Sequence, residues 1–307
     1  MFEIKKYVNE RIVNLILQEQ YESLSDFLYN IKNYSILKGS VLSNYCYKNH
    51  FGRGIGDIDI LINRNQIPLL EQSLINFGFE TIYKSSDNSR FDKIFLLSSS
   101  HQLMPYTKRL KHSRIKIDIN FDIFWGEYEG KRIDINEFLS DTIEMDIYGV
   151  KVKTLPPLKA MIHLILHHYK DMNSIYLLAT RKSIKYDMFK DVYYLWKNNQ
   201  DDISLDKLYV ISSEYEIIPY VFYVLYYTNE IFKDAKLENY VNSFRTQEGE
   251  TLLNCYGLCD KERKEWKYDF QTRLEADNLY DLIKDDLTEK DKEKIKINKR
   301  VFMGVTK

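Results

Sequence analysis

The chain has 307 residues, of which 44% are apolar, and its formal net charge is −1. This length allows two modest domains, and the apolar content supports a packed core and excludes a wholly disordered chain. The near-neutral charge excludes a general nucleic-acid coat, which needs a broad excess of Lys and Arg, so there is no strong nucleic-acid signal. The sequence contains three cysteines, Cys46, Cys255 and Cys259. This sparse, odd number indicates a reducing compartment rather than a disulfide scaffold.

The sequence gives no sign of secretion or of a membrane span. The N-terminal stretch MFEIKKYVNERIV has charges among its apolar positions and no cleavage-site pattern. The longest apolar run, residues 217–227, is shorter than a membrane span and contains Pro219. We therefore expect a cytoplasmic protein without a membrane partner.

Helices and strands alternate in the first half of the chain. The spacing of apolar residues predicts helices over residues 3–33, through Leu42 and Tyr45, and over 67–77. Period-two or short apolar patterns predict strands over residues 35–37, 57–62, 79–83, 93–97 and 114–125. The last of these has the clearest pattern, because an apolar residue stands at every second position from Ile115 to Trp125.

The pattern changes after Pro156-Pro157, where helical spacing dominates. Helices are predicted over residues 158–170, 189–196 and 217–232, and the charge-dense tail over residues 281–300 is predicted to be a solvated helix or a frayed end. We place a domain boundary near residue 153. The chain is then expected to have a mixed domain over residues 1–153 and a mainly helical domain over residues 154–307.

Two aspartates, Asp57 and Asp59, stand one residue apart in the apolar strand around DIDILI. Residues i and i+2 of a strand lie on one face, so the two carboxylates point the same way. A carboxylate taken out of water is costly unless it is paired or holds a cation. Mg²⁺ prefers one or two carboxylates together with phosphate oxygens, so this pair indicates a Mg²⁺ site. The competing interpretation is an edge strand with a solvated face.

A strand, a Gly-Ser turn, a helix and a strand with Asp-x-Asp follow one another in this chain. This order resembles the DNA polymerase β-like nucleotidyltransferase superfamily, and most closely a family of bacterial nucleotidyltransferases with a Lys-Gly-Ala/Ser segment, an Arg and Asp-x-Asp. The matching residues are Lys38-Gly39-Ser40, Arg53 and Asp57-Ile58-Asp59, followed by the segment HQLMP at residues 101–105. The resemblance implies an α/β (α+β) fold, in which a small mixed sheet is flanked by helices and followed by a mainly helical domain.

The resemblance also implies a third carboxylate on a later strand. Asp118 and Asp122 are both candidates, and they lie on the same face of the predicted strand. Their spacing from HQLMP favours Asp118. In that case Asp57, Asp59 and Asp118 would be the catalytic residues and would hold two Mg²⁺ ions. Two such ions stabilise the attacking and leaving oxygens of a phosphoryl displacement.

Four further residues are expected to bind the nucleotide. Gly39 would let the backbone approach the phosphates, Ser40 would donate to a phosphate oxygen, and Arg53 would neutralise phosphate charge. Lys182 is expected to reach the phosphates as well, although ordinary helix-surface charge explains it equally well.

The expected function is therefore Mg²⁺-dependent transfer of a nucleoside monophosphate from an NTP to an unknown acceptor, a small molecule or a peptide. One alternative is a sugar-transferring tailoring enzyme of the same fold that acts on a peptide natural product. The other is a non-catalytic, antitoxin-like partner. Two further features have plainer explanations: the basic run at residues 108–116 is predicted to be a solvated loop or hairpin, and His163, His167 and His168 are predicted to be core or supporting residues rather than metal ligands.

Overall fold

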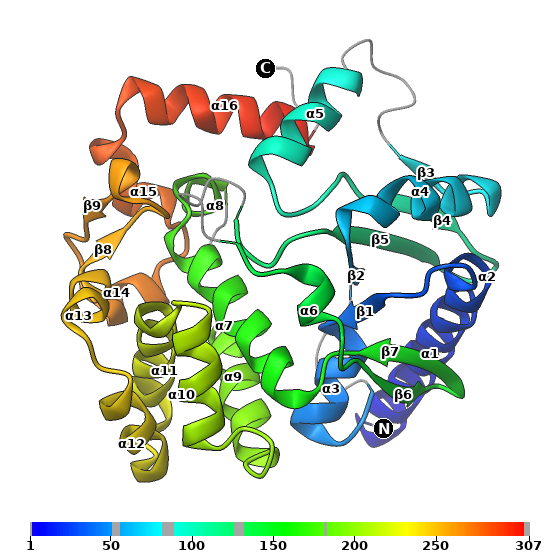
Figure 1. Cartoon of the computed structure of the whole chain (residues 1–307), viewed down its shortest axis with the longest axis horizontal. Helices are drawn as coiled ribbons and strands as arrows, with labels where there is room; N and C mark the ends of the chain where they lie inside the picture. Colours follow the sequence, from blue (N-terminus) through cyan, green and yellow to red (C-terminus); the bar gives the residue numbers. More distant parts are fainter. Residues whose placement is uncertain (1, 51–55, 82–88, 126–131, 181–182, 304–307) are drawn as a thin grey trace. The chain divides into compact units, whose positions relative to one another are not determined.

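The computed structural model describes residues 2–50, 56–81, 89–125, 132–180 and 183–303 (Figure 1). The chain divides into two compact units. The first comprises the described residues up to Ala160, and the second begins at Met161. The boundary predicted near residue 153 falls in the last strand of the first unit, and the two predicted domains stay a prediction.

The first unit contains a sheet and several helices, as expected for an α+β fold. Its helices are α1 (Phe2–Glu22), α2 (Leu24–Leu28), α3 (Gly39–Tyr47), α4 (Ile67–Asn76), α5 (Ser89–Ser99) and α6 (Ile135–Phe138). Its strands are β1 (Tyr34–Leu37), β2 (Ile58–Ile62), β3 (Glu80–Thr81), β4 (Tyr106–Arg109), β5 (Arg114–Asn120), β6 (Ile143–Ile147) and β7 (Val150–Thr154).

These strands form one mixed sheet of seven, in the order β3-β4-β5-β2-β1-β7-β6 (Figure 1). Strand β2 is antiparallel to β1 and parallel to β5, and β7 is parallel to β1. One edge is the short strand β3, which is antiparallel to β4 of the β4–β5 hairpin, and the other edge is β6 of the β6–β7 hairpin. The central strands are buried on both faces, which explains why β2 is apolar at nearly every position.

Helices pack against this sheet through hydrogen bonds and ring contacts between residues far apart in the sequence. Helix α3 contacts β1 and β6, and α2 contacts α4, where the Ser73 hydroxyl donates to the Phe27 carbonyl at 2.8 Å. The Phe27 ring also packs edge-on against Phe79, with 5.1 Å between the ring centroids. Helix α1 lies beside the β6–β7 turn, where the Tyr148 hydroxyl donates to Asn14 Oδ1 at 3.0 Å. Sheet and helices thereby share one apolar core.

Two strand predictions are wrong in their extent or type. Residues 93–97 lie in helix α5, because the side chains buried there, Asp92, Leu96 and Ser100, recur every four residues rather than every two. Strand β5 ends at Asn120 instead of residue 125, because the Asp122 carboxylate accepts a hydrogen bond from the Phe124 N–H at 3.0 Å and turns the chain. Of the strand predicted over residues 79–83, only Glu80 and Thr81 are described as a strand, and residues 82 and 83 lie outside the described part.

The second unit is mainly helical, as the sequence predicts. Its helices are α7 (Pro157–Asn173, with its first residues in the first unit), α8 (Ile175–Thr180), α9 (Tyr186–Asn198), α10 (Leu205–Glu214), α11 (Ile218–Phe232), α12 (Ala235–Ser243), α13 (Gln247–Leu253), α14 (Phe270–Glu275), α15 (Tyr280–Ile283) and α16 (Glu289–Met303). A small hairpin, β8 (Cys255–Tyr256) with β9 (Lys264–Glu265), completes it.

Helix α11 is the centre of this second unit. All its residues from Val221 to Leu225 are fully buried, and α9, α10, α12 and α13 contact it. A helix that is apolar on every side has to be covered on every side, which explains this arrangement. Across the described ranges, no helix is long and apolar enough to cross a membrane.

Candidate active site

Three aspartates meet on one face of the sheet in the first unit. Asp59 on β2 lies directly opposite Asp118 on the parallel strand β5, and Asp57 precedes Asp59 by two residues. Between them, Ile58 and Ile117 point to the other face and are buried in the core. The sheet register therefore brings together the three carboxylates that the sequence analysis selected.

Two lysines neutralise these carboxylates in the structure. Lys116 Nζ lies 3.0 Å from Asp57 Oδ2 and 3.3 Å from Asp118 Oδ2, so it joins the two strands. Lys38 Nζ lies 3.0 Å from Asp59 Oδ1. The Asn120 amide donates to the same Asp59 oxygen at 3.4 Å. A charged and hydrogen-bonded cluster thus lies within an otherwise apolar region of the sheet.

The three carboxyl groups do not share one environment. Burial, together with the negative charge of Asp59, raises the pKa of Asp118 to about 7, against the opposing effect of Lys116. Burial also acts to raise the pKa of Asp57, but the positive charges of Lys116 and Lys38 outweigh it and lower that pKa. For Lys116, burial is outweighed by Asp118 and Asp57, which raise its pKa and keep it charged.

The donor set is chemically suited to a divalent cation, although the carboxylate oxygens of the three aspartates, paired with Lys116 and Lys38, do not all lie within 4.8 Å of one another. Asp118 Oδ1 is buried and has no hydrogen-bond partner among the residues that the structure describes. An oxygen of that kind, beside two more carboxylates on one sheet face, is the type of ligand that Mg²⁺ binds. Asp57, Asp59 and Asp118 would hold the metal, which supplies charge stabilisation to a phosphoryl group when bound.

The Gly-Ser turn lies next to these carboxylates. Strand β1 ends at Leu37, which pairs with Asp59, and Lys38, Gly39 and Ser40 then lead into helix α3. Gly39 has φ +51°, a left-handed conformation that glycine adopts without cost. Lys38 has the same φ, so its placement beside Asp59 is maintained at some backbone cost. The turn and the aspartates therefore form one continuous site.

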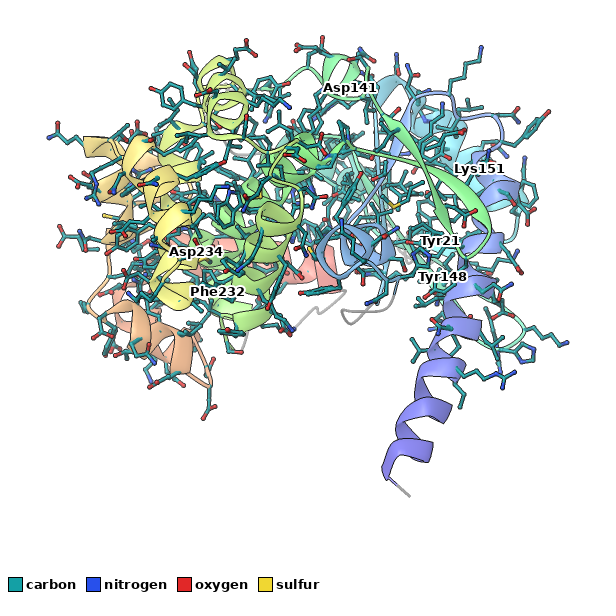
Figure 2. The ribbon with its side chains drawn as sticks, turned by 90° about the horizontal axis from the view of Figure 1, so that it is seen from below. Tyr21, Asp141, Tyr148, Lys151, Phe232 and Asp234 are labelled. Carbon is teal, nitrogen blue, oxygen red and sulfur yellow. The ribbon has the colours of Figure 1, made fainter. Side chains whose placement is uncertain are left out.

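Tyr21 supports this turn from helix α1. Its hydroxyl lies 3.6 Å from the point where a Cβ on Gly39 would stand, and its ring packs against Tyr148 with 6.1 Å between centroids. Figure 2 shows these two tyrosines together, one from α1 and one from the β6–β7 turn. Burial raises the pKa of Tyr21 to about 12, opposed by the adjacent Ser40. Tyr21 is therefore a neutral, buried side chain that packs against the turn.

Asp122 occupies a different environment from Asp118. Besides accepting from the Phe124 N–H, it lies 3.3 Å from Arg132 Nη1. Burial raises its pKa, against the hydrogen bonds and the arginine charges. Its carboxylate is engaged in a turn and an ion pair after the end of β5. The structure thus places Asp118, and not Asp122, beside Asp59.

Two of the predicted nucleotide-binding residues, Arg53 and Lys182, lie outside the residues that the structure describes. Three residues at the site were not selected from the sequence: Lys116, Asn120 and Tyr21. The signal for the first two was present, because residues 116, 118 and 120 share one face of a strand. The sequence contained no comparable signal for Tyr21, which reaches the turn only through tertiary packing.

Most of the chain matches a known family of proteins. Residues 15–233 match a family described as uncharacterised nucleotidyltransferases. The chain belongs to this nucleotidyltransferase family. No curated protein matches the sequence. The matched range includes the whole carboxylate cluster and the Gly-Ser turn, so the site lies in the part of the chain that carries the family likeness.

Three of the six histidines of this nucleotidyltransferase, His163, His167 and His168, lie on α7 in the second unit. His163 and His168 are largely buried, in line with the core position predicted for them. His167, His168 and Asp171 place their ligand atoms within 4.8 Å of one another. However, Lys170 Nζ lies 3.3 Å from His167 Nδ1 and 3.6 Å from Asp171 Oδ1. An ammonium group within the cluster disfavours a second cation there.

Metal binding to the nucleotidyltransferase is expected to release a proton at mildly acid pH. With a pKa of about 7, Asp118 is mostly protonated at pH 6 and mostly ionised at pH 8. A metal that binds its carboxylate displaces the proton, so Mg²⁺ affinity should fall as pH decreases, with release of about one proton at pH 6 and far less at pH 8. Calorimetric titration at both values, in buffers of different ionisation enthalpy, measures the release. A buffer-independent heat at pH 6 would contradict the expectation.

Proposed function

We propose that this nucleotidyltransferase moves a nucleoside monophosphate from an NTP to an acceptor, with two Mg²⁺ ions as cofactor and with pyrophosphate as the second product. The main support is the juxtaposition of Asp57, Asp59 and Asp118 beside the Gly39-Ser40 turn, in a chain of a nucleotidyltransferase family. The motif Lys38-Gly39-Ser40 followed by Asp57-Ile58-Asp59 further supports a place among bacterial members of the polymerase β-like superfamily.

The carboxylates, the Gly39-Ser40 turn and the nearby cations can supply the interactions that nucleotidyl transfer requires. The oxygen of an acceptor hydroxyl attacks the α-phosphorus and gives up its proton, for which the Asp118 carboxylate is the proposed acceptor. The bond between the α-phosphorus and the bridging oxygen breaks, and pyrophosphate leaves with the bonding electrons. The three carboxylates would hold the metal that neutralises the phosphates. The backbone at Gly39 and the hydroxyl of Ser40 would contact a phosphate oxygen, with Lys38 adjacent. Arg53 and Lys182 are proposed to add positive charge for the third phosphate.

The donor distinguishes this proposal from a sugar-transferring enzyme. A nucleotidyltransferase needs the triphosphate, whereas a sugar-transferring relative takes a nucleoside diphosphate sugar and releases the diphosphate. The proposed acceptor is a small molecule or a peptide. A non-catalytic, antitoxin-like partner would need neither donor.

Calorimetric titration with ATP, GTP, UTP, CTP and common nucleotide sugars tests the proposal. We expect at least one NTP to bind more tightly than its diphosphate, in the presence of Mg²⁺ and not with excess chelator, because the additional phosphate charge meets the metal and the cations around it. Arg53→Ala should weaken this binding. Binding of a nucleotide sugar alone would replace the proposal with the sugar-transferring alternative. Absence of any nucleotide binding would favour the non-catalytic one.

A further inference from the structure

The carboxylate cluster already contains cations that belong to the chain. Lys116 Nζ bridges Asp57 and Asp118 at 3.0 and 3.3 Å, and Lys38 Nζ pairs with Asp59 at 3.0 Å. Three carboxylates and two ammonium groups leave the cluster nearly neutral. Lys116 thus supplies positive charge to the two carboxylates that would also hold a divalent cation.

A metal ion and the Lys116 ammonium group cannot both bind strongly to the same carboxylate oxygens of Asp57 and Asp118. A divalent cation close to Asp57 Oδ2 and Asp118 Oδ2 would repel an ammonium group that lies within 3.3 Å of both. Asp118 Oδ1 is buried and unpartnered in the described structure, so this oxygen is available to a metal. A metal held there would repel the nearby Lys116 ammonium group, and the Lys116 contacts to Asp57 Oδ2 and Asp118 Oδ2 are the ones that this repulsion breaks. Metal binding therefore includes the cost of breaking these two ion pairs.

The two lysines differ in how freely they can leave. The Lys116 side chain is 38% exposed, and its partner Asp57 is 41% exposed, so the ammonium group lies at the solvent side of the cluster. Lys38 is 18% exposed and belongs to the Gly-Ser turn, where its backbone is held at φ +51°. The long, flexible stem of lysine lets Lys116 reorient without a backbone change. Lys116 is therefore the cation that can move, and Lys38 is the one that stays.

We infer that Lys116 is an internal counter-cation that holds Asp57 and Asp118 before a divalent cation binds, and that the metal displaces it from these carboxylates toward the phosphates of the donor. This inference rests on the proposed function for the identity of the donor. Lys116 is then a positioning residue. Without metal, its ammonium group holds the negatively charged carboxylates of Asp57 and Asp118 together. With metal bound, the positive charge of Lys116 becomes available to the substrate.

Mn²⁺ binding to the full chain at pH 8 tests the competition. In Lys116→Met the competing ammonium group is absent, so Mn²⁺ should bind about tenfold more tightly than to the wild type, which corresponds to about 1.4 kcal/mol. Lys116→Arg, which keeps the charge, should bind Mn²⁺ with nearly wild-type affinity. Lys151→Met is the matched control, because Lys151 is an exposed lysine on strand β7 of the same sheet (Figure 2), and its loss should leave the affinity unchanged.

Chemical labelling of the wild type tests the displacement without any substitution. An amine released from two ion pairs reacts faster with an acylating reagent, so mass spectrometry should show Lys116 labelled several-fold faster at saturating Mn²⁺ than without it, while Lys151 is unchanged. Equal Mn²⁺ affinity in wild type and Lys116→Met, or an unchanged labelling rate while Mn²⁺ binds, would overturn the inference and leave the proposed function intact. Failure of both proteins to bind Mn²⁺ would overturn the inference, and the nucleotide titration with Mg²⁺ would then decide the proposed function separately. Tight binding to Lys116→Met alone would support the inference.

Discussion

Replacement of Asp59 by asparagine is expected to abolish nucleotidyl transfer while the sheet stays folded. Asparagine has the same shape and keeps an oxygen that can accept from the Asn120 amide, but it lacks the negative charge that a divalent cation requires. Asp57→Asn and Asp118→Asn should act similarly, each with a loss of about a thousandfold or more in rate, because electrostatic stabilisation of the transition state depends on the full set. Pyrophosphate release from the NTP that binds measures the loss.

Asp122→Asn is the matched control for this prediction. Asp122 is as buried as Asp59, with 4% of each residue exposed, and asparagine can still accept from the Phe124 N–H. It should lower the rate far less than Asp118→Asn. Circular dichroism and thermal unfolding establish that each variant is folded. If Asp122→Asn were the more damaging of the two, the third carboxylate would have been assigned wrongly, and substantial activity in Asp59→Asn would exclude the two-metal mechanism.

Gly257→Ala is expected to destabilise the second unit by about 3 kcal/mol. Gly257 follows β8 with φ +105°, a conformation that residues with a Cβ rarely adopt. An added Cβ would lie 2.5 Å from the Glu262 carbonyl oxygen and 2.7 Å from its carbon, so backbone atoms would have to move. The Gly257 N–H also donates to the Asn173 carbonyl at 2.8 Å, and a shift of the turn would strain this bond.

Gly149→Ala is the control that measures the cost of a left-handed backbone conformation without a steric clash of the added Cβ. Gly149 has φ +80°, but an added Cβ would meet no atom within 4 Å. Its substitution should therefore cost only about 1 kcal/mol, the price of a left-handed conformation. Urea denaturation followed by tryptophan fluorescence gives both values: in a Trp125→Phe background Trp196 and Trp266 report on the second unit, and in a background that keeps only Trp125 the signal reports on the first. Equal destabilisation by the two substitutions would show that the clash at Gly257 is relieved by relaxation.

Local patterns in the sequence were sufficient for much of the candidate site. Alternation along β2 is enough to place Asp57 and Asp59 on one face, and the Gly39-Ser40 turn is marked by glycine between a strand and a helix. The long helices α7 and α11 likewise follow from apolar spacing over many residues. In these cases the residues that determine the structure are neighbours in the chain, so no distant contact is needed to predict them.

Strand pairing and helix packing between residues far apart in the sequence determined the remaining parts of the site and the fold. Alternation treats Asp118 and Asp122 alike, and only the end of β5 at Asn120 and the turn at Asp122 separate them. The pairing of β5 with β2 places Lys116 and Asp118 against Asp57 and Asp59, and the packing of α1 places Tyr21 behind Gly39. Residues 93–97 form a helix although their short apolar run is also typical of a strand. Register and packing depend on residues far apart in the sequence, so the tertiary structure alone determines which charges meet at this site.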